Sequence, residues 1–301
     1  MQVLSLPTPK NFSFWKTIYS HGWSSLPPFR VDKENRSFGR VIQLPEGNPF
    51  LLTITEQNKS LLHLHLPARI SLRKTERDSI IACVRTSFRH DEDFSEFYAE
   101  ARKHRQFQWI PKAGAGRMLR APTVFEDVVK MMCTTNCSWA LTEIMIGNFC
   151  SKLGEVLDNS LSTFPTAEAI ADKSEKFLRK EIRAGYRSPY LLELSRRVAR
   201  GTLNLECWRT STLPTNELFD EVRSVKGIGP YAAGNILKLL GRYDYLGIDS
   251  WCRKKFSEIH KNGRKVSDKT IERYYERFGK WRGLFFWLDV TKHWYEQKFP
   301  F

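Results

Sequence analysis

The residues of this chain that could do chemistry are concentrated in one glycine-rich turn. The turn reads Lys226-Gly227-Ile228-Gly229-Pro230 and is followed at once by Tyr231. Both glycines permit backbone angles that other residues resist, and Pro230 suits the first position of a helix, where a missing N–H costs nothing. Such a turn directs backbone N–H groups and the positive end of a helix dipole outwards, which suits a phosphate. The alternative is an ordinary structural corner between two helices.

A single carboxylate, Asp249, follows this turn after a short loop. It precedes a helical segment that carries Trp251, Cys252, Phe256 and Ile259. An isolated aspartate at a helix start usually caps the first N–H groups, and capping is therefore the simpler role. A helix N-terminus is also a favourable place for negative charge, which could stabilise a developing cation. The two roles are compatible.

Two amphipathic helices must hold the turn in place. Leu218, Val222 and Val225 recur at helical spacing before it, and Ala233, Ile236, Leu237 and Leu240 do so after it. Gly241 ends the second helix. We therefore expect a helical hairpin over residues 217–241 and a loop over 242–250 that contains Asp249.

The charge balance favours a polyanionic partner. The 301 residues contain 48 Lys and Arg against 33 Asp and Glu, a formal charge of +15 spread along the chain. Nucleic acid is the first candidate. The apolar runs are too short to cross a membrane, and residues 1–15 lack a signal-peptide pattern. We expect an intracellular, soluble monomer, located in the cytoplasm, nucleoid or nucleus.

The cysteines give no sign of a metal site. They stand at positions 83, 133, 137, 150, 207 and 252, without the paired spacing of a zinc or cluster site. Cys133 and Cys137 could share a helix face as half of a metal site, but no second pair completes it. We expect reduced cysteines and no metal bound by them.

The fold class indicated is α+β, mostly helical, with a small N-terminal antiparallel sheet. Residues 12–23 indicate a short helix, and β-rich runs follow at 38–44, 50–55 and 61–66. In the third run, leucines alternate with His63 and His65, which favours a solvated sheet face over a metal site. From residue 75 onwards the signals are helical. We expect a sheet domain over 1–74 and a helical region over 75–301.

The helical region contains a basic connection, candidate helix caps and a strongly aromatic C-terminal segment. The connection 109–122 carries Lys112, Arg117 and Arg120, and is either a loop that contacts a nucleic-acid backbone or a simple linker. Thr123 and Glu126 form a capping-box pattern, and Ser138 and Ser174 are candidate caps. The aromatic residues of 271–294 are expected to be mostly core.

Taken together, these features resemble the helix-hairpin-helix (HhH-GPD) DNA glycosylase superfamily. The resemblance covers most of the chain and rests on the run 227–233, Asp249, Gly185-Tyr186-Arg187 and Cys133-Thr134-Thr135-Asn136. The layout is similar to the 3-methyladenine and 8-oxoguanine DNA glycosylase branch. The resemblance implies that Asp249 is the catalytic carboxylate. It also implies that Lys226, Gly227, Ile228, Gly229, Asn136 and Arg187 contact DNA, and that a structural monovalent cation can sit at the hairpin.

The chain departs from the family pattern at informative positions. Lys226 replaces a usual proline, and Tyr231 stands where bifunctional members have a lysine that forms a Schiff base with the sugar. The cysteine cluster of the iron–sulfur branch is absent. The resemblance therefore implies a monofunctional enzyme of base excision repair without an iron–sulfur cofactor, which hydrolyses the N-glycosidic bond of a damaged base in double-stranded DNA.

The sequence leaves the substrate open. We nominate Tyr231, Trp251 and Trp281 as walls of a pocket for the flipped base. An alkylated purine suits an aromatic, monofunctional pocket, whereas the layout equally suits an 8-oxoguanine-type enzyme. A non-catalytic hairpin protein that only binds DNA would need the basic surface but not Asp249. An enzyme for acidic small molecules would explain the charge but not the hairpin.

Overall fold

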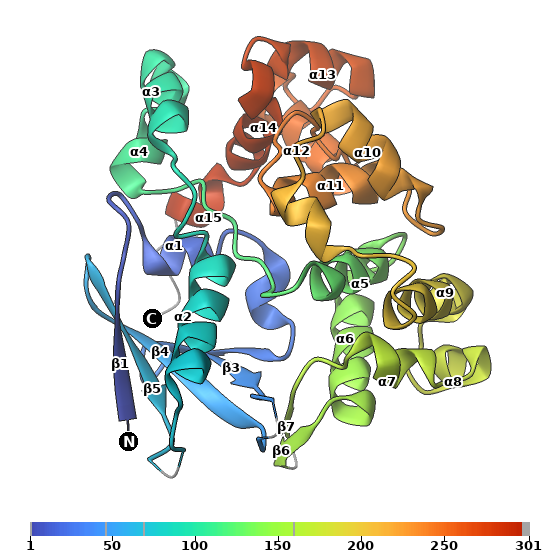
Figure 1. The fold of residues 1–301 in the computed structure, drawn as a ribbon. Coiled ribbons are helices and arrows are strands. Elements are labelled where there is room, and N and C mark those ends of the chain that lie inside the picture. Colours follow the sequence, from blue (N-terminus) through green and yellow to red (C-terminus); the bar gives the residue numbers. More distant parts are fainter. Residues whose placement is uncertain (1, 46, 69, 159, 297–301) are drawn as a thin grey trace. The chain divides into compact units, whose positions relative to one another are not determined.

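The computed structural model describes residues 2–45, 47–68, 70–158 and 160–296 (Figure 1). The described residues form two compact units, one ending at Leu203 and the other starting at Asn204. The first unit contains an antiparallel sheet and helices, and the second is helical. The predicted α+β class, mostly helical with an N-terminal sheet, is confirmed.

The sheet has five antiparallel strands in the order β1-β5-β4-β3-β2. The strands are β1 (Gln2–Pro7), β2 (Phe29–Asp32), β3 (Ser37–Ile42), β4 (Phe50–Asn58) and β5 (Leu61–Leu66). The three central strands match the predicted runs, whereas both edge strands were missed. β2 has only four residues and follows Pro27-Pro28, and β1 ends in Pro7, so neither presents a long alternating pattern.

One face of the sheet is buried. In β5, Leu62, Leu64 and Leu66 are at most 1% exposed, while His63 and His65 lie half-buried on the opposite face. The ring of His65 hydrogen-bonds through Nε2 to Thr55 Oγ1 at 2.8 Å. Within the described residues, no group of three His, Cys, Asp or Glu side chains could hold a metal ion.

Helices cover the apolar face of this sheet. The first unit contains α1 (Phe14–Ile18), α2 (Lys74–Phe88), α3 (Ser95–Lys103), α4 (Trp109–Ala113), α5 (Val124–Thr134), α6 (Trp139–Leu153), α7 (Ala167–Ala171), α8 (Glu175–Lys180) and α9 (Ser188–Ala199). Phe88 of α2 packs edge-on against Phe38 of β3 with centroids 5.8 Å apart, and stacks on Phe14 of α1 at 5.3 Å. Aromatic packing therefore joins the sheet to α1 and α2.

Several local predictions for this unit are confirmed, and others need correction. Thr123, Ser138 and Ser174 each cap a helix by accepting the N–H three residues on. The helix expected over 12–23 is shorter, because α1 ends at Ile18 and a separate 3-10 turn spans Gly22–Ser25. A small hairpin of β6 (Val156–Asp158) and β7 (Leu161–Ser162) lies in the region expected to be helical.

Glu126 departs from its predicted capping-box role because its carboxylate is used elsewhere. It pairs with Arg40 of β3 through both oxygens and with Lys130 at 2.8 Å. The three side chains are 2%, 11% and 0% exposed for Glu126, Arg40 and Lys130. Burial by itself would raise the pKa of Glu126, but the adjacent cations lower it to about 2. A buried ion cluster thus ties β3 to α5.

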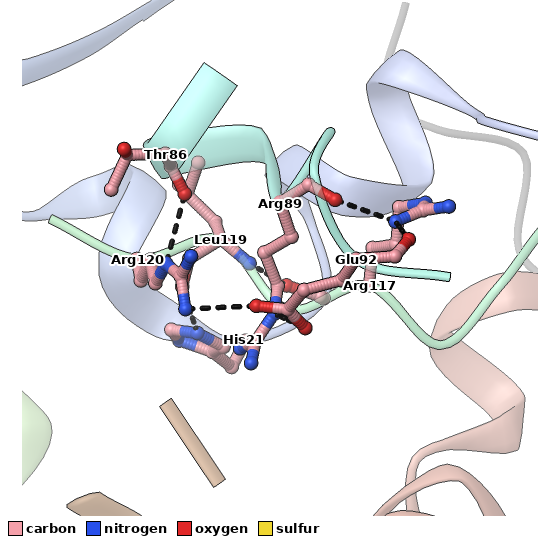
Figure 2. Close-up of polar contacts among 8 residues, drawn as sticks. His21, Thr86, Arg89, Glu92, Arg117, Leu119 and Arg120 are labelled. Carbon is pink, nitrogen blue, oxygen red and sulfur yellow. Dashed lines mark hydrogen bonds and ion pairs between the residues drawn. The ribbon is translucent and has the colours of Figure 1, made fainter. Parts of the chain in front are cut away.

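Figure 2 shows how the connection between α4 and α5 is anchored to the end of α2. Arg117 donates through Nη1 to the carbonyl oxygens of Arg89 and Glu92 at 2.6 and 2.9 Å. Arg120 donates to the carbonyl of Thr86 at 2.9 Å and pairs with the Glu92 carboxylate at 2.9 Å. Arg117 and Arg120 are only 2% and 6% exposed. These two arginines therefore serve a structural linker, and the interpretation of them as nucleic-acid contacts is wrong.

The second unit is a bundle of short helices. It contains α10 (Thr215–Ser224), α11 (Pro230–Leu240), α12 (Ser250–His260), α13 (Asp268–Glu276), α14 (Arg282–Val290) and α15 (Lys292–Glu296). Tyr275, Phe278, Phe285 and Phe286 are at most 3% exposed, so the expected aromatic core is confirmed. No described helix is long and apolar enough to cross a membrane.

The Glu126 cluster predicts a large loss of stability when its anion is removed. In Glu126→Gln, Arg40 and Lys130 stay buried without a counter-charge, so the free energy of unfolding should fall by about 3–5 kcal/mol in urea titrations at pH 7. The control is Glu175→Gln, which breaks the exposed pair with Arg179 and should cost under about 1 kcal/mol. Equal losses in the two variants would contradict this account.

Candidate active site

The predicted helical hairpin is present in the second unit. α10 ends at Ser224, α11 begins at Pro230, and Gly227 in the turn has φ of +89°. Ile228 is 5% exposed, and its N–H donates to the carbonyl of Val225 at 3.1 Å. The side chain of Ile228 therefore anchors the turn from inside and leaves the outer surface to its neighbours.

Only one of the two turn glycines needs its special backbone freedom. Gly229 has φ of −86° and ψ of 177°, which any residue adopts, and a Cβ there would meet nothing within 4 Å. The expectation that Gly229 requires unusual angles is wrong. Its role is to be the N-cap residue of α11, where it leaves the first N–H groups open.

The outer surface of the turn can accept an anion. Lys226, Gly227 and Gly229 are exposed. Among the described residues, no backbone acceptor faces the N–H of Gly227 or of Gly229. The positive end of the dipole of α11, a helix of 11 residues, adds to the positive field of this surface. This combination is what a phosphate group requires.

Asp249 is the N-cap of α12, as the sequence predicts. Its Oδ1 accepts the N–H of Cys252 at 2.6 Å, and the residue is half-buried. The second carboxylate oxygen is not needed for the cap and can act on another group. The cap fixes the direction of the carboxylate relative to α12.

The loop 242–249 that carries Asp249 is held by groups from the surrounding helices. Gly283 N–H donates to the carbonyl of Tyr243 at 2.7 Å, and Arg282 donates through Nε to the carbonyl of Asp244. Lys238 donates through Nζ to the carbonyl of Leu246 at 2.6 Å. Lys238 is fully buried, and this burial lowers its pKa to about 8. The loop is therefore held by donors from both α11 and α14.

Sequence reasoning missed Lys238 and Arg282. The signal for Lys238 was present, because a lysine stands between Leu237 and Leu239 in a helix that is otherwise mostly apolar. A charged residue in a buried helical register indicates a specific partner. Arg282 carries no such signal, since it opens a helix at a half-exposed position.

The three residues nominated for a base pocket all lie in the second unit. Tyr231 is half-buried in the first turn of α11, and its carbonyl accepts the Asn235 side-chain N–H at 2.9 Å. Trp251 packs against Trp294 with ring centroids 5.5 Å apart, whereas Trp281 stacks on Tyr243 at 5.4 Å. Their assignment to a pocket stays a prediction.

Asn136 and Arg187 lie in the first unit and belong to one network. Asn136 is exposed, has φ of +47°, and donates through Nδ2 to the hydroxyl of Tyr186 at 3.2 Å. Arg187 is 4% exposed and donates to the carbonyls of Met132 and Thr135. Its guanidinium lies 4.5 Å from the ring centre of Tyr186, which is 48% exposed. The exposed groups of this network are therefore Asn136 and Tyr186, and Arg187 supports them.

The fold matches that of known DNA glycosylases. The structure of 3-methyladenine DNA glycosylase from Archaeoglobus fulgidus superposes with a TM-score of 0.74 at 19% identity, covering 97% of this chain and 99% of that one. The 8-oxoguanine glycosylase/lyase of Clostridium acetobutylicum superposes with a TM-score of 0.74 at 20% identity, covering 96% of each chain. The chain has the fold of the helix-hairpin-helix DNA glycosylases.

Sequence comparison agrees with this assignment. The chain is 23% identical over 282 residues to the probable N-glycosylase/DNA lyase of Methanothermobacter thermautotrophicus, and the match covers 85% of each chain. No family model matches the chain. The predicted resemblance to the 3-methyladenine and 8-oxoguanine branch of the helix-hairpin-helix DNA glycosylases is therefore confirmed.

The two turn glycines should respond differently to alanine. Gly227→Ala forces a Cβ onto a residue at φ +89° and should lower the free energy of unfolding by about 1–3 kcal/mol. Gly229→Ala places the same atom in open space at an allowed φ and should change it by less than about 1 kcal/mol. Urea titration of both variants tests the turn geometry. A larger loss at Gly229 than at Gly227 would show that the turn differs from the one described.

Proposed function

We propose that the protein is a monofunctional DNA glycosylase of base excision repair. Its substrate is a damaged purine flipped out of double-stranded DNA, and its product is an intact strand with an abasic site. The observation that carries the proposal is Asp249, a half-buried carboxylate whose Oδ1 caps α12 at 2.6 Å from the N–H of Cys252, in a chain with the fold of the DNA glycosylases.

The hairpin supplies the DNA-backbone site in this proposal. Lys226, Gly227 and Gly229 form its exposed outer surface, and the N-terminus of α11 contributes its dipole. Contacts of this kind hold phosphates without reading the bases. In the first unit, Asn136 and Tyr186 form an exposed polar and aromatic edge braced by Arg187, which suits contact with bases next to the extruded nucleotide.

Asp249 performs the central step. Breaking the bond between C1′ and the base nitrogen leaves both electrons with the base and builds positive charge on the deoxyribose. A fixed carboxylate stabilises that charge more in the transition state than in the ground state. The same carboxylate orients a water, whose oxygen bonds to C1′ while a proton is released. Because the cap and the loop bonds fix Asp249 in advance, little reorganisation is needed.

The absence of a lyase step is supported by the residue at position 231. Tyr231 is a phenol, so it cannot form an imine with the opened sugar. Lys238 lies on the same helix, but its ammonium is fully buried against the carbonyl of Leu246. The relative from Methanothermobacter thermautotrophicus carries lyase in its name, whereas the reaction proposed for this chain ends with base release and leaves the strand uncut.

An alkylated purine is the preferred substrate class. It carries a formal positive charge, leaves as a neutral base without prior protonation, and is attracted to aromatic faces such as those nominated at Tyr231, Trp251 and Trp281. The second candidate is 8-oxoguanine, because the 8-oxoguanine glycosylase/lyase of Clostridium acetobutylicum matches the fold with the same TM-score as the 3-methyladenine enzyme. A panel of damaged duplexes distinguishes the two.

The remaining expectations are part of the same proposal. The protein acts as an intracellular monomer on double-stranded DNA, without an iron–sulfur cluster. A monovalent cation at the hairpin would be held by backbone carbonyls of the turn and would supply further positive charge for a phosphate. The chemistry described above does not depend on that ion.

Replacing Asp249 separates its two roles. Asn keeps the shape and a side-chain oxygen for the N–H of Cys252 but has no negative charge. Asp249→Asn should therefore unfold at nearly the same denaturant concentration as the wild type and bind a damaged duplex. Its single-turnover rate of base release should fall by about 100-fold or more. Equal rates in the two proteins would show that Asp249 is only a cap.

The product distinguishes hydrolysis from a lyase reaction. With Tyr231 at the critical position, the wild type should release the base and leave the strand uncut until alkali is added. Borohydride should trap no protein–DNA complex during turnover. Tyr231→Lys is the matched variant, because it restores an amine at this position, and it should yield a trapped complex. A complex trapped with the wild type and abolished by a lysine substitution would mean that another amine performs lyase chemistry.

A further inference from the structure

A buried lysine lies directly beneath the loop that carries the candidate catalytic carboxylate. Lys238 is 0% exposed and stands in the last turn of α11, between the buried residues Leu237 and Leu239. Its Nζ donates to the carbonyl of Leu246 at 2.6 Å and lies 5.6 Å from the ring centre of Trp287 in α14. The amine therefore reaches from one helix to the loop 242–249, three residues before Asp249.

An ammonium group at such a place requires an explanation. Removing a charge from water is strongly unfavourable unless bonds and opposite charges compensate for it. A leucine or methionine would fill the same position of α11 without that cost. The groups near Lys238 include the Leu246 carbonyl, the face of Trp287 and, from α12 and its cap, Cys252 and the negative charge of Asp249. All of these belong to the loop, its carboxylate or the helices α12 and α14.

We infer that Lys238 is a positioning residue, which holds the segment Leu246–Asp249 and places a positive charge on the protein side of the Asp249 carboxylate. This inference rests on the proposed glycosylase function. It assigns Lys238 no contact with DNA or with the reacting atoms. Its ammonium is enclosed, so its effect on the reaction passes through the loop and Asp249.

The loop is built in a way that makes this support necessary. Beyond the carboxylate, the segment is fixed by the bond from Cys252 N–H to Asp249 Oδ1. Before it, Gly247 has φ of +64° and lies against the side chain of Asn235. The Lys238 bond to Leu246 fixes the chain just ahead of this glycine. Without it, the segment can relax, and small displacements of a reacting group cost rate steeply.

The groups that face Lys238 also set its response to pH. They are Asp249 at the start of α12, Cys252 in α12 and the ring of Trp287 in α14. The Cys252 thiol stays neutral, because burial and the adjacent Asp249 raise its pKa. Burial lowers the pKa of Lys238 from 10.5 to about 8, against the pull of Cys252 and Asp249. The positive charge is therefore present at neutral pH and lost as the pH rises through about 8.

The test uses Lys238→Met, which keeps the length and apolar stem of the side chain but removes the ammonium. Single-turnover base release should fall by about 10- to 100-fold, while affinity for a damaged duplex stays within about 2-fold. In the wild type, the rate should decline as the pH rises from 7 to 9.5, and this decline should be absent in Lys238→Met. Lys238→Gln keeps a hydrogen-bond donor without the charge. Its rate should lie between those of the wild type and Lys238→Met, and it should also lack the decline in rate above pH 7.

Lys255→Met is the matched control. It removes an ammonium from α12 in the same unit, but Lys255 pairs with Glu258 near the surface, so the rate and pH profile should remain those of the wild type. Wild-type rates in Lys238→Met, or a wild-type profile that is flat from pH 7 to 9.5, would overturn the inference. If Lys238→Met does not fold, the pH profile of the wild type alone tests the inference.

The outcomes separate this inference from the proposed function. If the wild type releases base, Asp249→Asn does not, and Lys238→Met matches the wild type, then only the role of Lys238 is wrong. If the wild type releases no base from any damaged duplex of the panel, the glycosylase proposal is wrong and the inference falls with it. Borohydride trapping of the wild type that is lost in Lys238→Met would identify Lys238 as a nucleophile and overturn its role as a positioning residue.

Discussion

The candidate site depends on a loop that has no regular structure of its own and must present one carboxylate in a fixed direction. A loop of this kind is held by what its backbone groups contact. Here the carbonyls of Tyr243, Asp244 and Leu246 accept donors from α14 and α11, and Asp249 closes the segment by capping α12. Helices α11 and α14 therefore hold the loop, and α12 fixes the carboxylate through the cap. The hairpin turn lies at the start of α11. Helix α11 thus carries the proposed phosphate-binding surface at its start and, near its end, Lys238, which bonds to the loop.

The positive charge of the chain is divided between surface and interior. Among the described residues, six cations are buried: Arg89, Arg117, Arg120, Lys130, Arg187 and Lys238. Each donates to a backbone carbonyl or pairs with a carboxylate, so it holds elements together instead of facing a ligand. The formal charge of +15 consequently overstates the charge available to DNA. Lys226 at the hairpin turn is exposed instead of buried, so a polyanion could reach it.

The features that the sequence predicts are those set by residues close together in the chain. The hairpin, the caps at Thr123 and Ser138, and Asp249 at the start of α12 are set by residues a few positions apart, and all were predicted correctly. The strand β2 was missed because its four residues owe their conformation to pairing with β3. For a related reason the role of Glu126 was misjudged, and the sequence could not decide between a linker and a nucleic-acid contact for Arg117 and Arg120. Apart from Lys130, which stands four positions after Glu126, their partners described above lie 25 to 86 positions away. Spacing along the chain carries no information about such distant pairs.

The geometry of Gly229 and Lys238 shows why residue type alone is a poor guide to a site. Glycine suggests unusual backbone angles, yet Gly229 adopts ordinary ones, so what it contributes is an uncovered helix start. Lysine in a protein thought to bind DNA suggests a phosphate contact, yet Lys238 is enclosed and bonds to the loop. An enclosed amine cannot approach a sugar carbon, whereas the residue at the family's nucleophile position, Tyr231, has no amine. The buried amine of Lys238 therefore supplies positive charge but no nucleophile, and the side chain of Tyr231 supplies no amine. In the proposed reaction, the Lys238 amine supports the Asp249 carboxylate from the protein side, and water completes the reaction.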